Sequence, residues 1–129
     1  MLSCRQPGRV RAIVDWELST LGDPVADVAL MCAYRDPALD GVLGIEAAWT
    51  SERFPEVDAL RAMYEEASGA PLANWDFYLA LAYYKLAVIA EGIAYRHRLG
   101  GTAGGGFEKV AATVPSFLEA GLKVVDGLG

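Results

Sequence analysis

Histidine and cysteine are scarce in this chain of 129 residues. There is one histidine, His97, and there are two cysteines, Cys4 and Cys32. So few of these residues, with no CxxC pair, exclude a zinc site of the usual spacing and a disulfide framework. We therefore expect both cysteines to be reduced, buried thiols in a cytoplasmic protein.

Basic residues are also few, with 11 Lys and Arg against 17 Asp and Glu and a formal net charge of −6. The negative electrostatic field of such an acidic chain disfavours binding to nucleic acid or to an anionic membrane surface. No basic segment followed by a long apolar run comes after Met1, as a signal peptide would require. The most apolar stretch, residues 77–90, contains Lys85 and falls short of the roughly 20 residues that span a bilayer. We expect neither a nucleic-acid nor a membrane partner.

Apolar residues are abundant, at 53% of the chain, and the mean hydropathy is +0.24. This composition excludes a disordered chain, and the length suits a single domain. Surplus apolar surface on a small domain indicates that something covers it.

The first 16 residues predict a β-hairpin. Residues 6–9 form a Gln-Pro-Gly-Arg turn signal, and the β-branched residues Val10, Ile13 and Val14 follow it. Two strands alone are barely stable in water, so this hairpin must pack on another part of the molecule.

Helical patterns replace the strand pattern after Gly22. Asp23 predicts an N-cap with Pro24 at the first helical position, and this helix is expected to end near Arg35, before Asp36-Pro37. Residues 36–55 are ambiguous, with a predicted turn at Asp40-Gly41 and a possible short helix over residues 44–51.

Two further helices are predicted between the prolines and glycines that follow. One runs from Pro55 to about Ser68 and is closed by Gly69. The longest, over residues 75–99, is expected to be capped by Asn74. Its apolar residues lie nearly all round it, which is typical of a helix buried on most sides. The apolar face expected for the first of these helices comprises Val57, Leu60, Met63, Tyr64 and Ala67.

Residues 100–106 are a glycine-rich breaker, and residues 107–125 are again helical. Pro115 either kinks this segment or begins a second helix within it. The fold class is therefore mainly α, an N-terminal β-hairpin followed by a helical bundle.

The candidate chemistry lies in the stretch DWELSTLGDPVADVA, residues 15–29. Asp15, Glu17 and Asp23 fall within nine residues, and Asp27 follows one helical turn later. A carboxylate just past a strand end can hold Mg²⁺, which takes one or two carboxylates together with phosphate oxygens. The alternative is that Asp23 only caps a helix and Asp15 only ends a strand, and the residues alone leave both open.

Residues 10–29, VRAIVDWELSTLGDPVADVA, closely resemble the metal-binding segment of aminoglycoside phosphotransferase-like kinases, most of all the branch associated with acyl-CoA dehydrogenases. The resemblance implies that Asp15 ligates the Mg²⁺ that bridges the ATP phosphates. Glu17, two residues later, is a further candidate for cofactor binding, with a surface or hairpin-bracing role as the alternative. The resemblance also implies that Asp23 is a structural cap and that Asp27 supports the catalytic loop.

The same resemblance implies the C-terminal lobe of a protein kinase-like fold. Residues 1–129 would then be a single partial domain, with the hairpin over 1–16 and a helical segment over 17–129. The nucleotide-binding lobe and the HGDxxxxN catalytic loop of the family are not in this sequence, and Met1 falls just past the position expected for the catalytic Asn. We therefore expect no catalytic residue in this chain.

Two other features are excluded as catalytic motifs. His97 has no Gly-Asp after it, so we expect a solvated residue or a partner of the helix dipole. The glycine-rich residues 100–106 lack GK[ST] and follow a helix, so they are not a P-loop.

In the family the long helix helps to wall the cleft for the acceptor substrate. This makes Tyr84 and Glu91 on that helix candidates for a substrate pocket, and Tyr34 and Arg35 at the end of the first helix are candidates beside them. Core packing or a solvated helix face is the alternative for each.

Two functions follow from this sequence. The first is the C-terminal part of an ATP- and Mg²⁺-dependent phosphotransferase, which transfers phosphate to a hydroxyl of a small metabolite or an aminoglycoside-like acceptor and is inactive on its own. The alternative is a non-catalytic helical interaction or ligand-binding module, which forms a homodimer or pairs with a separate N-terminal half.

Overall fold

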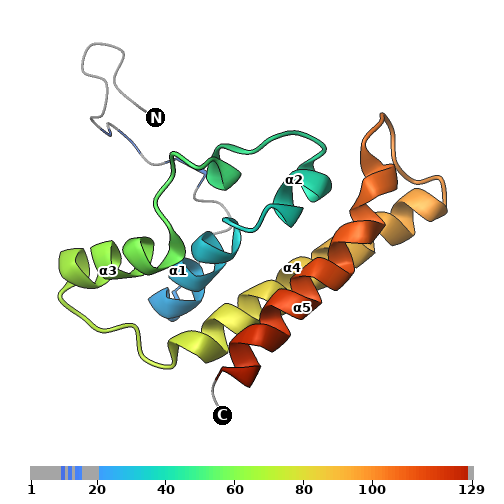
Figure 1. The fold of residues 1–129 in the computed structure, drawn as a ribbon. Coiled ribbons are helices and arrows are strands. Elements are labelled where there is room, and N and C mark those ends of the chain that lie inside the picture. Colours follow the sequence, from blue (N-terminus) through green and yellow to red (C-terminus); the bar gives the residue numbers. More distant parts are fainter. Residues whose placement is uncertain (1–9, 11, 13, 16–20, 128–129) are drawn as a thin grey trace.

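The computed structural model describes Val10, Ala12, Val14, Asp15 and residues 21–127, and within these it is mainly helical, as predicted (Figure 1). Val10 has an isolated β-bridge, and no strand lies within the described part of the chain. The hairpin predicted over residues 1–16 falls largely outside that part. The elements are α1 (Pro24–Ala33), α2 (Ala38–Leu43), the 3₁₀ turn η1 (Ala48–Thr50), α3 (Val57–Ser68), α4 (Trp75–Arg98), the 3₁₀ segment η2 (Phe107–Ala112) and α5 (Thr113–Asp126).

The two long helices α4 and α5 form the body of the molecule. Figure 1 shows them side by side and running in opposite directions, with α1 and then α3 on one side. The short helix α2 packs near η2 and the start of α5. Phe117 of α5, Val110 of η2 and Cys32 of α1 are the largest fully buried side chains, so the core lies where these elements meet α4.

The start of α1 confirms the prediction at Asp23 and Pro24. The backbone of Asp23 is extended, its side chain accepts from the amide of Val25, and Pro24 begins the helix. The helix ends at Ala33, and Tyr34 and Arg35 form the turn that follows it.

The predicted turn at Asp40-Gly41 is wrong, because both residues lie inside α2. The carboxylate of Asp40 accepts from the amide of Ala47 at 2.8 Å and from the Thr50 hydroxyl at 2.9 Å, so it stabilises the next loop rather than a turn. A Cβ on Gly41 would lie 2.6 Å from Cγ2 of Thr113, so this position needs glycine for close packing.

The short helix predicted over residues 44–51 is also wrong, apart from the single turn η1. Gly44, with a φ of +70°, ends α2 in the left-handed region, which glycine adopts without strain.

The helix predicted from Pro55 to Ser68 is α3, which begins at Val57 and ends at Ser68, with Gly69 in the left-handed conformation as expected. Only part of its predicted apolar face packs inward. Leu60 is buried, with Val57 and Tyr64 partly buried against the core, whereas Met63 and Ala67 are exposed.

Pro115 lies near the start of α5. This confirms the alternative in which Pro115 begins a second helix rather than kinking a continuous one. The 3₁₀ segment η2 ends at Ala112, and Pro115 is the third residue of α5, where its missing N–H leaves no helical hydrogen bond unmade. The glycine-rich residues 100–106 form the predicted break between α4 and η2.

The longest helix, α4, begins at Trp75 as predicted, but its cap differs. Asn74 has a φ of +54° and its side chain makes no capping hydrogen bond. The prediction of burial on most sides is wrong as well, because Phe77, Tyr84, Val88 and Ile89 are all more than half exposed. Nothing in the described part of the chain covers that face.

Among the described residues α4 is also the one helix long and apolar enough to cross a membrane, judged by length and composition alone. The estimate that its apolar stretch is too short is therefore wrong, because the helix continues to Arg98. About 33% of its most apolar window is buried inside the molecule, and the core helix of a soluble protein passes the same test. The absence of a membrane partner stays a prediction.

Candidate functional site

The predicted site lies just before α1, and a hydrogen bond between residues far apart in the sequence fixes the start of that helix. Oδ1 of Asp23 accepts from the Val25 amide at 3.0 Å, and Oδ2 accepts from the hydroxyl of Tyr78 on α4 at 2.7 Å. The Tyr78 hydrogen bond, followed by that of Val25, lowers the pKa of Asp23, and the same contact raises the pKa of Tyr78. The start of α1 is thereby fixed against α4.

Asp15, the expected Mg²⁺ ligand, is exposed and has a φ of +76°. Few residues other than glycine adopt this left-handed conformation, and Asp is among those that tolerate it best. Asp15 thus tolerates this backbone conformation, and its side chain is exposed. Glu17, the second expected cofactor-binding residue, lies outside the described residues.

Asp27 is exposed in the first turn of α1, where a carboxylate interacts favourably with the helix dipole. It makes no hydrogen bond or ion pair with any residue that the structure describes. Its expected support of a catalytic loop stays a prediction.

The donor set at this site suits a metal that is shared with phosphates. No group of three or more His, Cys, Asp or Glu side chains that could hold a metal occurs within the described ranges. One accessible carboxylate fits Mg²⁺, which keeps water and phosphate oxygens as its other ligands, and does not fit a metal held by protein ligands alone.

Arg35, one of the expected substrate-pocket residues, has a structural role here. Its side chain is only 8% exposed, and Nη1 donates to the carbonyls of Trp49 and, at 3.0 Å, Ser51. Nη2 forms an ion pair with Glu56 at 3.3 Å. Tyr34 is partly buried against the core, with its ring 6.3 Å from that of Trp49. These two residues hold the loop before α3.

Tyr84 and Glu91, the other pocket candidates, lie on the exposed side of α4. Glu91 pairs with Arg98 at 2.7 Å. Tyr84 lines an apolar hollow of about 170 Å³ between α4 and α5, whose other walls include Phe117, Gly121 and Leu122. The structure therefore does not bring the four candidates to one pocket, and an acceptor-binding role for them stays a prediction.

His97 lies in the last turn of α4, as expected for a partner of the helix dipole. Its Nδ1 is 2.8 Å from the hydroxyl of Thr102, and its ring stacks on Phe107 with centroids 5.9 Å apart. It closes the glycine-rich loop onto α4.

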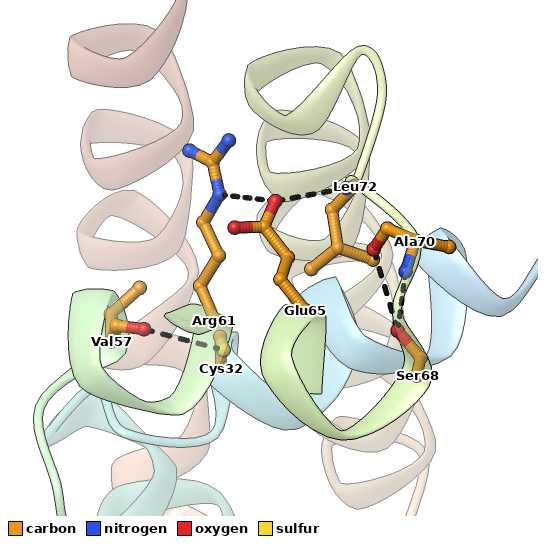
Figure 2. A network of polar contacts seen from close by, with 7 residues as sticks. All are labelled: Cys32, Val57, Arg61, Glu65, Ser68, Ala70 and Leu72. Carbon is orange, nitrogen blue, oxygen red and sulfur yellow. Dashed lines mark hydrogen bonds and ion pairs between the residues drawn. The ribbon is translucent and has the colours of Figure 1, made fainter. Parts of the chain in front are cut away.

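Glu65 of α3 is not among the residues predicted for the site, and it links α3 to the loop before α4. Figure 2 shows its carboxylate between Arg61, at 3.4 Å, and the backbone amide of Leu72, at 2.9 Å. The Leu72 hydrogen bond is the main cause of the lowered pKa of Glu65. The four-residue spacing of Arg61 and Glu65 could have indicated the ion pair, but not the amide of Leu72 in the loop before α4.

Cys32, at the edge of the same network, is buried as predicted and contacts the carbonyl of Val57 at 4.0 Å (Figure 2). Burial, and then the charge of Asp58, raises the pKa of this thiol to about 11. A thiol that stays protonated at neutral pH is a poor nucleophile and a poor metal ligand, so Cys32 belongs to the core. Cys4 lies outside the described residues.

Comparisons with known proteins give one family and a consistent set of relatives. A model of the phosphotransferase enzyme family matches residues 1–81. Acyl-CoA dehydrogenase family member 11 of Homo sapiens is 34% identical over 119 residues, which is 90% of this chain and 15% of the relative. Family member 10 of Mus musculus is 40% identical over 102 residues, which is 76% of this chain and 9% of the relative.

A plant protein extends this set. The probable acyl-CoA dehydrogenase IBR3 of Arabidopsis thaliana is 36% identical over 104 residues, covering 75% of this chain and 13% of its own length. No solved structure matches the chain. The chain thus spans about 15% or less of the length of these curated relatives.

Proposed function

Since this chain belongs to the phosphotransferase enzyme family, as the resemblance of residues 10–29 predicts, we propose that it is part of an ATP-dependent kinase for a small molecule and that Asp15 binds the Mg²⁺ of the nucleotide. The observation that carries the proposal is the family match over residues 1–81, which includes the whole stretch from Asp15 to Asp27. The hairpin over residues 1–16, with Asp15 at its end, is part of the same proposal.

Phosphoryl transfer depends on positioning and on neutralisation of charge, and bound Mg²⁺ supplies the latter by bridging phosphate oxygens. The residues of this chain contribute to positioning. Asp15 offers an exposed carboxylate on a residue with a left-handed backbone conformation. Eight residues later, the bonds from Val25 and Tyr78 to Asp23 fix the point at which the segment joins the helical body.

The acceptor in this proposal is a hydroxyl group of a small metabolite or of an aminoglycoside-like compound. The chain has no HGDxxxxN sequence, whose Asp would position that hydroxyl. We therefore expect negligible ATP turnover from the isolated chain, and the useful measurement on it is nucleotide-metal binding.

Mn²⁺ in place of Mg²⁺ makes this binding visible by the relaxation of water protons. We expect Asp15→Asn to weaken the binding of Mn·ATP to the chain at least tenfold, because the variant loses the charged oxygen ligand. Asp76→Asn, a change of the same charge at an exposed position in the first turn of α4, is the matched control and should bind like the parent chain. Equal binding by the Asp15 variant and the parent would contradict the proposal.

A further inference from the structure

A polar hollow of about 310 Å³ is lined by the first turn of α3, the first turn of α4 and the last turn of α5. None of residues 15–29 lines it, so it is separate from the proposed Mg²⁺ site. Two cationic and two anionic side chains surround this hollow, namely Arg61, Lys123, Asp58 and Asp76. Below, the polar hollow means this space, which no part of the proposed function uses.

The guanidinium of Arg61 is held in place at the wall of the polar hollow. Its carbon Cζ lies 5.2 Å from the centre of the Trp75 ring, and Trp75 itself is buried. Its Nε lies 3.4 Å from the carboxylate of Glu65, which also accepts from the Leu72 amide at 2.9 Å. A guanidinium that is stacked on a buried ring and anchored at Nε keeps one orientation. It therefore loses little conformational freedom when it binds an anion.

The two terminal nitrogens of Arg61 have no acceptor among the residues that the structure describes. Figure 2 shows them beyond Nε, with no dashed line from either of them to another residue. Asp58 lies three residues earlier on α3, a spacing at which side chains on a helix can pair, and yet Arg61 pairs with Glu65 instead. The terminal N–H groups thus remain free to donate to the carboxylate of a ligand as a fork.

The other three charges around the polar hollow also have no partner. Asp58, Asp76 and Lys123 are exposed, and the side chain of each makes no hydrogen bond or ion pair within the described part of the chain. Two such carboxylates repel a simple anion, and two such cations repel a simple cation. A molecule that carries both kinds of charge can interact favourably with both sets of side chains.

We propose that the polar hollow binds a small zwitterion, a molecule with one carboxylate and one ammonium group, as in an amino acid. Arg61 and Lys123 bind the carboxylate, and Asp58 and Asp76 bind the ammonium group. A volume of about 310 Å³ leaves room for several carbon atoms between the two charged groups of the ligand. The proposal does not depend on Asp15 or on the binding of a nucleotide.

Amide and indole chemical shifts of the full chain labelled with nitrogen-15 measure this binding. The probes are the straight-chain amino acids from glycine to 6-aminohexanoate, each compared with the carboxylic acid and the amine of the same chain length. At least one amino acid should bind at least tenfold more tightly than its matched acid and amine, because each of these lacks one charge. The ion pairs are exposed, so we expect a dissociation constant on the order of 1 mM. No binding by any amino acid, or equal binding by a matched acid or amine, overturns the proposal.

Variants of the two cations test where the carboxylate of the amino acid binds. Arg61→Gln and Lys123→Gln should each weaken amino acid binding at least threefold, because each removes a donor to that carboxylate. Arg53→Gln and Lys85→Gln remove the same charges at exposed positions outside the polar hollow and should leave the affinity unchanged. The Lys123 side chain makes no polar contact with any described residue, so Lys123→Gln should melt like the parent chain. Parental affinity in both Arg61→Gln and Lys123→Gln would overturn the proposal.

Asp58→Asn gives a result that a fault in folding does not produce. This variant should weaken the binding of the amino acid, whose ammonium group loses a charged partner. It should strengthen the binding of the matched carboxylic acid, because a charge that repels this probe is removed. A variant that is damaged in its fold would bind both probes less tightly. Weaker binding of both probes, or no change for either, would overturn the assignment of the ammonium group to Asp58.

Discussion

The hydrogen bond between Asp23 and Tyr78 couples the stability of the fold to pH at the start of α1. The pKa of Asp23 is lowered from its ordinary 3.8, so this contribution is present above that pH and is lost as the pH falls through the lower value in the folded chain. The pKa of Tyr78 is raised from its ordinary 10.0, so on the alkaline side the contribution is lost as the pH rises through the higher folded value.

We therefore expect Tyr78→Phe to melt below the parent chain from about pH 4 to pH 10 and to approach it outside that window. Circular dichroism of thermal unfolding between pH 2 and pH 11 measures the difference. Asp23→Asn, which has no carboxylate to titrate, should lose the acid side of the dependence. A difference between Tyr78→Phe and the parent that stays constant across the range would show that the hydrogen bond does not form.

Among the expected site residues, Arg35 is the one whose replacement by alanine should lower the free energy of unfolding most. Arg35→Ala removes a side chain that is only 8% exposed and leaves the part-buried carbonyl of Trp49 and the exposed carbonyl of Ser51 without their donor, which costs about 1–3 kcal/mol of the free energy of unfolding. Glu56→Gln removes only a carboxylate that is 81% exposed and should cost less than about 0.5 kcal/mol. Urea unfolding of both variants measures these free energies. If the two variants lost similar amounts of the free energy of unfolding, the hydrogen bonds from Arg35 to the carbonyls would not be its main contribution.

These residues show which features local sequence patterns predict and which they do not. Asp23 as a cap was predictable because Asp-Pro acts on its own neighbours. Its bond to Tyr78, 55 residues away, was not, since no local pattern encodes a contact made by folding. Arg35 was a pocket candidate at the end of the first helix, and its burial depends on a loop whose course local sequence patterns do not predict.

At the scale of elements, the contact of α2 with α5 depends on the absence of one side chain. Gly41→Ala would place a Cβ 2.6 Å from Cγ2 of Thr113 and should cost about 1–3 kcal/mol of the free energy of unfolding. Thr113→Ser removes that methyl group and keeps the hydroxyl that donates to the Val110 carbonyl at 2.7 Å.

In the Thr113→Ser background the cost of Gly41→Ala should therefore vanish, and alanine should stabilise α2 through its higher helix propensity. A double-mutant cycle in urea gives the coupling free energy, which we expect to exceed about 1 kcal/mol. Additive effects would show that the two elements do not meet at this point.

Helix boundaries were predictable where proline and glycine act locally, as at Pro24 and Gly69. Between residues 36 and 55 the same reasoning failed at Asp40-Gly41, because these residues serve contacts to Thr50 and Thr113 and not a turn. Turn preference is a local quantity, and packing between elements overrides it. The candidate Mg²⁺ ligand Asp15 could be predicted from the sequence because it lies in a contiguous motif.

At the scale of the whole molecule, the helical composition was predictable from periodicity, but the burial of α4 was not. Its apolar residues extend nearly all round, and the described helices cover only one side of it. Periodicity gives the surface that a helix offers, whereas burial also depends on what the rest of the chain, or a second copy, places against it.

The buried side, in contrast, joins four helices into one core, and this determines how the molecule unfolds. Buried residues of α1, α3, α4, η2 and α5 form a single cluster around Phe117, which is fully buried. We expect Phe117→Ala to lower the free energy of unfolding by about 3–5 kcal/mol, and Ile45→Ala, at a position 68% exposed, to change it by less than about 0.5 kcal/mol. Because one core serves all these elements, helix content by circular dichroism and tryptophan fluorescence should follow the same urea transition in each variant. If Phe117→Ala separated the two transitions, α1 and α3 would be stable without α5, and the single core would be excluded.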